Sequence, residues 1–312
     1  MSCPHCRHHQ NTRMIARIQQ TVVFSILAGL GVWIWHVVPD YSRIYIGFLA
    51  LAGVYIIYMA ILFIATYRLN RTDSEPGATL VALVQAFLRE VCIAPVVFLW
   101  RQPFRSQTLP DFLPSSDKTG VVFIHGFFCN RAFWAPWMTQ LLVGKRAFES
   151  VTLEPAFGSI DDYALVIETA VAKVTQATGQ APTLICHSMG GLAARAWLRA
   201  NPANEARIQH VITLGTPHFG TALSSETPLL PFINTHQMQH LGTWTQQLAK
   251  DESLSLYSKF TCWYSNCDNI VAPTSTAMLP GADNRLVTAQ GHVSMAFDTR
   301  VMQESIAVVA KL

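Results

Sequence analysis

Two long apolar segments dominate the pattern of hydrophobic and polar positions near the N-terminus. Residues 18–38 and 44–67 contain no Asp, Glu, Lys or Arg, and each is long enough to cross a hydrocarbon core of about 30 Å as a helix. The tryptophans and tyrosines near their ends suit the membrane–water interface. Because only residues 39–43 join the two segments, we expect a transmembrane helical hairpin at residues 18–67, preceded by a tail at residues 1–17.

Basic residues flank this hairpin at its two outer ends. Arginines precede the first segment and follow the second, at Arg7, Arg13, Arg17, Arg68 and Arg71. The turn between the segments holds just Asp40 and Arg43. Since positively charged flanks tend to stay in the cytoplasm, we expect both ends of the hairpin to lie there, together with the rest of the chain.

A third apolar stretch, residues 79–100, has two interpretations. It is long enough to span, which would place the rest of the chain on the opposite side of the membrane. However, Arg89 and Glu90 lie at its centre and Pro95 follows, and charges at the centre of a span are costly. We therefore expect residues 68–119 to form a helix that lies in the interface or docks on the next domain, followed by a linker with prolines and serines.

Beyond residue 120, short apolar runs alternate with amphipathic stretches. The predicted strands are residues 121–125, 150–154, 183–186, 211–214, 260–264 and 285–289. The predicted helices are residues 133–142, 161–177, 189–200 and 300–310. Such alternation is typical of an α/β fold in which helices cover both faces of a mostly parallel sheet. We expect one such domain at residues 120–312, with about six strands.

The composition limits the possible functions. Hydrophobic residues make up 51% of the chain and charged residues 13%, and the excess of apolar residues lies in the N-terminal third. A net charge of +3 without a basic, aromatic-rich stripe argues against nucleic-acid binding. The seven cysteines have no framework spacing, which favours free thiols. Cys3 and Cys6 lack a second pair to complete a metal site, so we expect neither a metal nor a cofactor.

Ser188 lies in a motif typical of a catalytic nucleophile. The apolar run 183–187 leads directly into Ser188, and a Met-Gly-Gly sequence then opens a helical stretch. A serine on such a sharp turn is presented at the sheet edge, beside a helix N-terminus that favours developing negative charge. The pattern G-x-S-x-G has the compact Cys186 in its first position. An ordinary serine in a tight turn is the alternative interpretation.

A second motif predicts an anion-stabilising loop. Gly126 and Phe127 directly follow the strand that ends at His125. Glycine lets the backbone approach the site, where the N–H of Phe127 would face the substrate. Together with the N–H of Met189, it would form an oxyanion hole. We interpret His125 as a residue that packs and orients this loop.

An acid and a base are expected later in the chain, in the order Ser, Asp, His. Asp268 lies in a turn after one predicted strand, and His292 follows the last strand. His292 would accept the proton of Ser188, and Asp268 would orient the imidazole ring. His218 is an alternative base, although it comes early for this order.

Together these segments resemble the α/β-hydrolase superfamily, and within it the bacterial triacylglycerol lipases and esterases. The resemblance runs from about Gly120 to Leu312 and rests on residues 125–130, 157–163, 186–191 and 215–221 with the Asp268 and His292 sites. It implies a catalytic triad of Ser188, Asp268 and His292, with the N–H groups of Phe127 and Met189 as oxyanion donors. We also expect substrate contacts at His125, Gly126, Phe128, His187 and His218. The first hairpin of that fold is missing, so we expect six strands rather than eight.

The connection at residues 221–258 is too long for an ordinary loop and contains many apolar residues. We interpret it as a lid over an acyl pocket; a pair of helices that covers the sheet is the alternative. With the hairpin, these features predict a multi-pass protein of a bacterial inner membrane that hydrolyses lipid esters in the cytoplasm. Its partners would be a lipid ester substrate and membrane lipids. Acyl transfer or thioester hydrolysis would use the same triad, and a non-catalytic lipid-binding scaffold is a further alternative.

Overall fold

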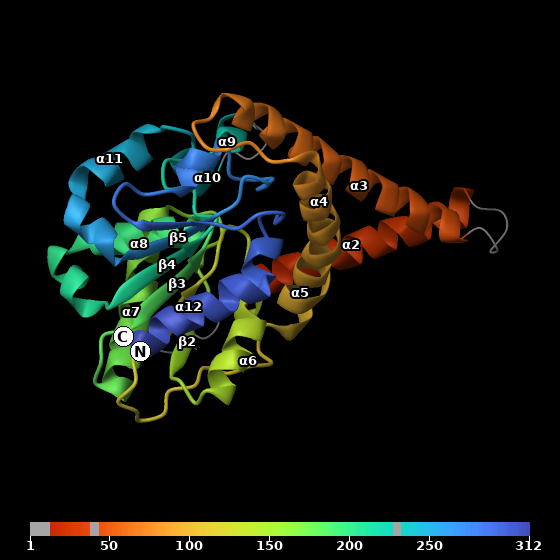
Figure 1. Ribbon diagram of the computed structural model, residues 1–312. Coiled ribbons are helices and arrows are strands. Elements are labelled where there is room, and N and C mark those ends of the chain that lie inside the picture. Colours follow the sequence, from red (N-terminus) through yellow and green to blue (C-terminus); the bar gives the residue numbers. More distant parts are fainter. Residues whose placement is uncertain (1–12, 38–43, 227–231) are drawn as a thin grey trace.

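The computed structural model describes residues 13–37, 44–226 and 232–312. Figure 1 shows an α/β domain with a group of N-terminal helices on one side. Residues 1–12 of the predicted tail, with Cys3 and Cys6, lie outside the described residues, and so does the predicted turn at residues 39–43. Residues 14–17, which were predicted to belong to the tail, are already helical. The two apolar segments that flank this turn are helical.

A parallel sheet forms the centre of the α/β domain. Its strands are β1 (Val121–Ile124), β2 (Phe148–Ser150), β3 (Thr183–His187), β4 (His210–Leu214), β5 (Phe260–Tyr264) and β6 (Asp283–Leu286). They form one six-stranded sheet in the order β2-β1-β3-β4-β5-β6, and every neighbouring pair is parallel. The predicted fold class and strand number are confirmed.

Two strands lie a few residues earlier than predicted. β2 ends at Ser150. Three residues later, the N–H of Leu153 donates to Nε2 of His125 at 3.0 Å instead of to a neighbouring strand. β6 ends at Leu286, and Ala289, which was predicted to be in this strand, has a φ of 59°. A positive φ is incompatible with extended backbone, so the strand cannot continue through Ala289.

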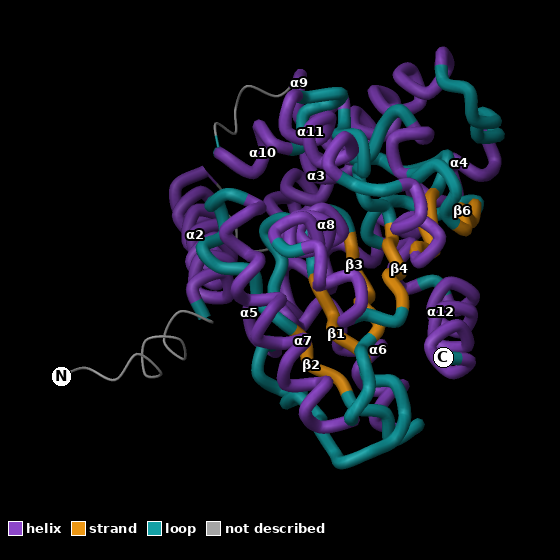
Figure 2. The backbone as a smooth tube through the Cα atoms, turned by 90° about the vertical axis from the view of Figure 1, so that its left-hand side faces the viewer, coloured by secondary structure: helices purple, strands orange, loops and turns teal. Residues whose placement is uncertain are grey.

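Helices cover both faces of the sheet, and Figure 2 shows strands lying between α8 and α12. The main helices of the domain are α6 (Ala135–Val143), α7 (Ala164–Thr178), α8 (Met189–Ala200) and α12 (Thr299–Lys311). Short 3₁₀ turns lie in the connections between strands and helices. They are η4 (Arg131–Trp134), η5 (Ile160–Tyr163), η6 (Pro202–Arg207), η8 (Thr274–Ala277) and η9 (Ser294–Phe297).

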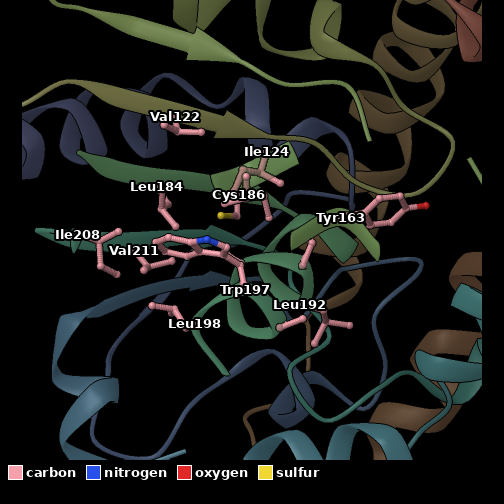
Figure 3. Close-up of a cluster of buried hydrophobic side chains, with 14 of the residues drawn as sticks. Val122, Ile124, Tyr163, Leu184, Cys186, Leu192, Trp197, Leu198, Ile208 and Val211 are labelled. Atoms are coloured by element: carbon pink, nitrogen blue, oxygen red, sulfur yellow. The ribbon is translucent and has the colours of Figure 1, made fainter. Parts of the chain in front are cut away.

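Alternate residues of each strand face opposite cores, as the pleat of a strand requires. Val122 and Ile124 of β1 join the core under α7 and α8, where Trp197 is fully buried (Figure 3). Val121 and Phe123 join the other core, which α6 and α12 cover. Burial on both faces explains why β1, β3, β4 and β5 read as largely apolar runs, whereas the edge strand β6 is mostly polar and partly exposed.

The N-terminal segments form a layered helical group. It consists of α2 (Met14–Val37), α3 (Ile44–Leu69), the 3₁₀ turn η2 (Asn70–Thr72), α4 (Leu80–Pro95), the π-helical turn η3 (Val96–Arg101) and α5 (Gln102–Arg105). Within the described residues, three helical stretches are long and apolar enough to cross a membrane: 14–36, 45–72 and 80–105. Figure 1 shows α2 and α3 extending away from the α/β domain, with α4 beside that domain.

The long connection after β4 is largely helical. It contains α9 (Ala222–Glu226), α10 (Ile233–Gln237), α11 (Thr243–Asp251) and the 3₁₀ turn η7 (Leu254–Lys259). Residues 227–231 lie outside the described part. Asn234 of α10 is buried and donates to the carbonyl of Ala156 at 2.9 Å, which ties this insert to the loop after β2.

Trp197→Ala tests the core beneath α8. The indole is buried, and its Nε1–H donates to Glu168 at 3.0 Å. We expect the substitution to lower the free energy of unfolding by about 3–5 kcal/mol, because it leaves a large cavity. Urea unfolding of the protein in detergent measures this loss. Leu165→Ala, on the exposed side of α7, is the matched control and should change stability by about 0.5 kcal/mol or less; equal effects would contradict this account.

Candidate active site

Ser188 occupies a sharp turn between β3 and α8. Its backbone has a φ of 53° and a ψ of −128°, an unusual conformation for a residue with a side chain, and its N–H donates to the carbonyl of Leu214 at 2.9 Å. The two glycines that follow are required by space. A Cβ on Gly190 would lie 2.4 Å from the carbonyl oxygen of Ile124, and one on Gly191 would lie 2.3 Å from Oγ1 of Thr216. The motif therefore encodes a strained elbow, as functional sites often do.

His292 and Asp268 form a buried pair. Nδ1 of His292 lies 2.9 Å from Oδ2 of Asp268, and both side chains are nearly inaccessible. The other carboxylate oxygen accepts the N–H groups of Ile270 and Val271, each at 2.8 Å. This leaves Asp268 little rotational freedom, so the imidazole is held in one orientation.

Several short contacts bring Ser188 and this pair to the same edge of the sheet. Leu214, which accepts the Ser188 N–H, precedes Gly215. A Cβ on Gly215 would lie 3.1 Å from Oδ2 of Asp268 and 3.3 Å from Nδ1 of His292. The ring of His187 lies 4.7 Å from the ring of His292, centroid to centroid. These contacts place Ser188 and the His292–Asp268 pair at the carboxyl end of the sheet. Among the hydrogen bonds of the described residues none joins Ser188 to His292, so the triad stays a prediction.

The environment of His292 favours its protonated form. Burial alone would lower the pKa of this imidazole, but the charge and hydrogen bond of Asp268 outweigh it, and Glu90 adds to them. The pKa of His292 is therefore raised above its ordinary value. Consequently the neutral ring, which is the form that can accept a proton, predominates only at higher pH than for a free histidine.

The predicted oxyanion donors lie beside Ser188. A Cβ on Gly126 would be 2.7 Å from the Cβ of Ser188, so glycine at this position lets the loop approach the serine. Among the described residues, neither the N–H of Phe127 nor that of Met189 has a hydrogen-bond partner. Both groups are therefore available to a substrate oxygen, although their role stays a prediction.

His125 and His187 are buried beneath the site. Nδ1 of His125 lies 2.8 Å from the carbonyl of Gly126, and burial lowers the pKa of His125 to about 4. His187 stacks on Phe133 at 4.4 Å, and its Nε2 lies 3.1 Å from the carbonyl of His292. Burial and the neighbouring His292 hold the pKa of His187 well below its usual range. These contacts support orienting roles, and they add no support for the predicted substrate contacts.

His218 lies elsewhere in the interior. Its ring nitrogens lie 3.1 Å from Oγ1 of Thr213 and 3.4 Å from Nη1 of Arg195. Arg195 in turn forms a buried ion pair with Glu252 at 2.6 Å. The ring of His218 is fully buried, and these contacts give no support to its predicted roles as a substrate contact or as an alternative base.

Four aromatic side chains lie next to the predicted oxyanion loop. Phe157 stacks on Phe232 of the insert at 4.1 Å between centroids, and on Phe128 at 6.0 Å. Phe127 lies 5.9 Å from Phe157 and 6.5 Å from Phe232. We call these residues the aromatic cluster. Phe128 was predicted as a substrate contact, whereas the sequence did not predict that Phe157 and Phe232 stack beside it.

Glu90, which the sequence did not single out for the site, contacts the loop after His292. This carboxylate lies on α4, is almost completely buried and accepts the N–H groups of Val293 at 2.9 Å and Ser294 at 2.8 Å. The two carboxylate oxygens of Glu90 therefore bind the backbone directly after His292. The sequence does contain a signal for this contact, because the charged residues Arg89 and Glu90 at the centre of an apolar helix require partners. From the sequence alone, these two charges predict only that the helix does not span the membrane.

Comparisons with known proteins are consistent with this architecture. A model of the alpha/beta hydrolase family matches residues 121–301. The mature lipase BlEst2 of Bacillus licheniformis is similar to this chain with a TM-score of 0.56 and 18% identity, covering 65% of this chain and 96% of the lipase. Lipase B of Aspergillus fumigatus is similar with a TM-score of 0.52 and 15% identity, covering 62% and 57%. No curated protein matches the sequence.

Asp268→Asn tests the electrostatics of the pair. Loss of the carboxylate charge should lower the pKa of His292, because burial would then be opposed mainly by Glu90. Histidine NMR across a pH series measures this, with the His292 signal assigned by its loss in His292→Asn. Asp117→Asn removes an exposed carboxylate and should leave the titration unchanged. An unchanged midpoint in Asp268→Asn would refute the proposed cause.

Proposed function

The chain belongs to the alpha/beta hydrolase family, and from this we infer that it is a membrane-anchored serine hydrolase that cleaves carboxylic esters of lipids. The observation that carries the proposal is the 2.9 Å contact between His292 and Asp268 beside a serine on a strained strand-to-helix turn. An orienting carboxylate, an imidazole and an activated hydroxyl are the parts that nucleophilic acyl transfer requires.

Each residue has a defined role in the proposed reaction. Oγ of Ser188 attacks the ester carbonyl while Nε2 of His292 takes the hydroxyl proton, and the carbonyl electrons move onto oxygen. The N–H groups of Phe127 and Met189 stabilise that oxyanion. Collapse of the intermediate expels the alcohol, which receives the proton from His292. Water then attacks the acyl-enzyme in the same way and releases the carboxylic acid.

Two features favour a lipid substrate. The N-terminal helices are long and apolar, and their outward side chains, such as Leu49, Ile57 and Leu80, are largely exposed, which suits contact with acyl chains. The aromatic cluster offers an apolar surface beside the predicted oxyanion loop. An enzyme held at a bilayer meets acylglycerols and phospholipids at high local concentration.

We further propose that α2 and α3 span the membrane and that α4 docks on the catalytic domain at the cytoplasmic face. Arg89 donates to the carbonyl of Ala289 at 2.9 Å, and Glu90 binds the loop after His292. Both charged residues at the centre of α4 are thus engaged by the domain, while Leu80, Val84 and Leu88 of the same helix remain exposed. A helix lying in the interface would have this arrangement.

Ser188→Ala tests the nucleophile. Wild-type protein in detergent should react covalently with a fluorophosphonate probe and hydrolyse a medium-chain ester, whereas Ser188→Ala should lose labelling and several orders of magnitude in turnover. Ser258→Ala, an exposed serine of η7, is the matched control. Absence of labelling in the wild type, or equal labelling of Ser188→Ala, would remove the basis of the proposal.

Phe232→Ala tests the acyl surface. We expect a higher KM for long-chain esters, by about tenfold, with little change for acetyl esters, because loss of the ring removes apolar contact area only from the longer chain. The comparison uses KM values for acetyl and dodecanoyl esters of one alcohol. Ile233→Ala changes the adjacent, exposed residue and should preserve the chain-length preference. A uniform effect on both esters would contradict a role of Phe232 in acyl binding.

A further inference from the structure

Several buried polar side chains interrupt the otherwise apolar N-terminal helices, and three of them bond to loops beside the proposed site. These three are Gln19 on α2, Glu90 on α4 and Gln102 on α5, which are 2%, 1% and 0% exposed. A buried polar group is costly unless its hydrogen bonds are satisfied, and helices that needed only to pack or to anchor would have apolar residues at these positions. The hydrogen-bond partners of these three side chains therefore indicate why polar residues occur at these positions.

Glu90 holds the loop that carries the proposed base. Its two oxygens accept the N–H groups of Val293 and Ser294, at the start of η9, where no earlier turn supplies acceptors. A Cβ on Gly291 would lie 2.7 Å from Oε2 of Glu90. Glycine before His292 therefore makes room for a carboxylate from another element, and that carboxylate holds the two residues directly after His292.

Gln19 and Gln102 hold the loop that carries the proposed oxyanion donor. Nε2 of Gln19 donates to the carbonyl of Phe128 at 2.9 Å, and Nδ2 of Asn130 donates to Oε1 of Gln19 at 3.2 Å. Oε1 of Gln102 accepts the N–H of Asn130 at 2.6 Å, and the carbonyl of Gln102 accepts from Nδ2 of Asn130 at 2.9 Å. Phe128 itself has a φ of 53°, so this loop needs external contacts to keep its conformation.

We propose that Gln19, Glu90 and Gln102 are positioning residues, through which the N-terminal helices set the geometry of both catalytic loops. The inference rests on the proposed hydrolase function and deepens it: the membrane helices are part of the catalytic apparatus as well as an anchor. Gln19 and Gln102 bond to the loop that follows Phe127, one of the two proposed oxyanion donors. Glu90 bonds to the loop that follows His292, the proposed base. The helical group connects to both, so a change in how these helices pack alters the site on two sides.

The charge of Glu90 provides a readout that a purely structural contact lacks. Glu90 contributes to the raised pKa of His292, after the larger contribution of Asp268. His187, whose pKa burial holds well below its usual range, faces the ring at 4.7 Å between centroids. On the helix of Glu90, the neighbouring Arg89 binds the carbonyl of Ala289. Burial raises the pKa of Glu90 itself, and its hydrogen bonds from Val293 and Ser294 oppose that rise. Where Glu90 is ionised, removing its charge should lower the pKa of His292 and move the acid limb of the pH profile to lower pH.

The experiment uses the full-length protein in detergent micelles and measures the second-order rate of labelling by a fluorophosphonate, with kcat and KM for a medium-chain ester from pH 5 to 9. Glu90→Gln and Gln19→Ala are the test variants. Gln85→Ala on α4 and Thr21→Ala on α2 are the controls, because both side chains are exposed and the Thr21 hydroxyl bonds only to Arg17 of its own helix. Thermal unfolding of each variant monitors the fold.

We expect Glu90→Gln and Gln19→Ala to lower the labelling rate and kcat by about 10–100-fold with little change in KM, since small displacements of reacting groups have effects of this size. In Glu90→Gln the acid limb should also shift to lower pH, and both controls should stay within about twofold of wild type. Wild-type rates in both test variants would overturn the proposal. Losses of labelling rate and kcat that match the unfolded fraction, with the acid limb at the wild-type pH, would also overturn it. If wild-type protein itself fails to label, the proposed function fails instead.

Discussion

Ser188 adopts a backbone conformation that few residues with side chains tolerate, and the surrounding structure accommodates this one turn. The elbow exists because β3 passes directly into α8, with glycines at 190 and 191 where any side chain would strike Ile124 or Thr216. Its N–H is bonded to Leu214 of the next strand. The parallel sheet then places the ends of β4 and β5 and the segment after β6 beside the serine. The His292–Asp268 pair depends on that placement.

The second organising feature is the set of buried polar side chains on otherwise apolar helices. Glu90 and Gln102 are buried at positions where the helices contact loops of the α/β domain, and Gln19 does the same from α2. Each satisfies backbone groups of residues next to predicted catalytic positions. The cost of burying these side chains is offset by hydrogen bonds that the loops otherwise lack. As a result, the N-terminal helices and the domain share one hydrogen-bonded framework.

Buried histidines illustrate why residue type alone is a poor guide to role. His125, His187 and His218 all lie in motifs near the proposed site, yet each ring is enclosed and engaged by interior groups. For His187 and His218, burial holds the pKa of the ring well below its usual range, with His292 beside the first ring and Arg195 beside the second adding to the effect. His292 differs because Asp268 lies within hydrogen-bond distance of its ring. A carboxylate partner distinguishes the candidate base from the structural rings.

Local patterns in the sequence determined the class of fold, the six strands, the apolar helices and the residues of the elbow, because periodicity and turn chemistry act over a few neighbouring residues. They also identified Asp268 and His292 as candidates through their order after successive strands. Only the tertiary structure decided that Glu90, some two hundred positions earlier, holds the backbone after His292, that Gln19 and Gln102 support the other loop, and that Phe232 joins Phe157. Such contacts join residues far apart in the chain, and no local pattern specifies which buried donor meets which acceptor.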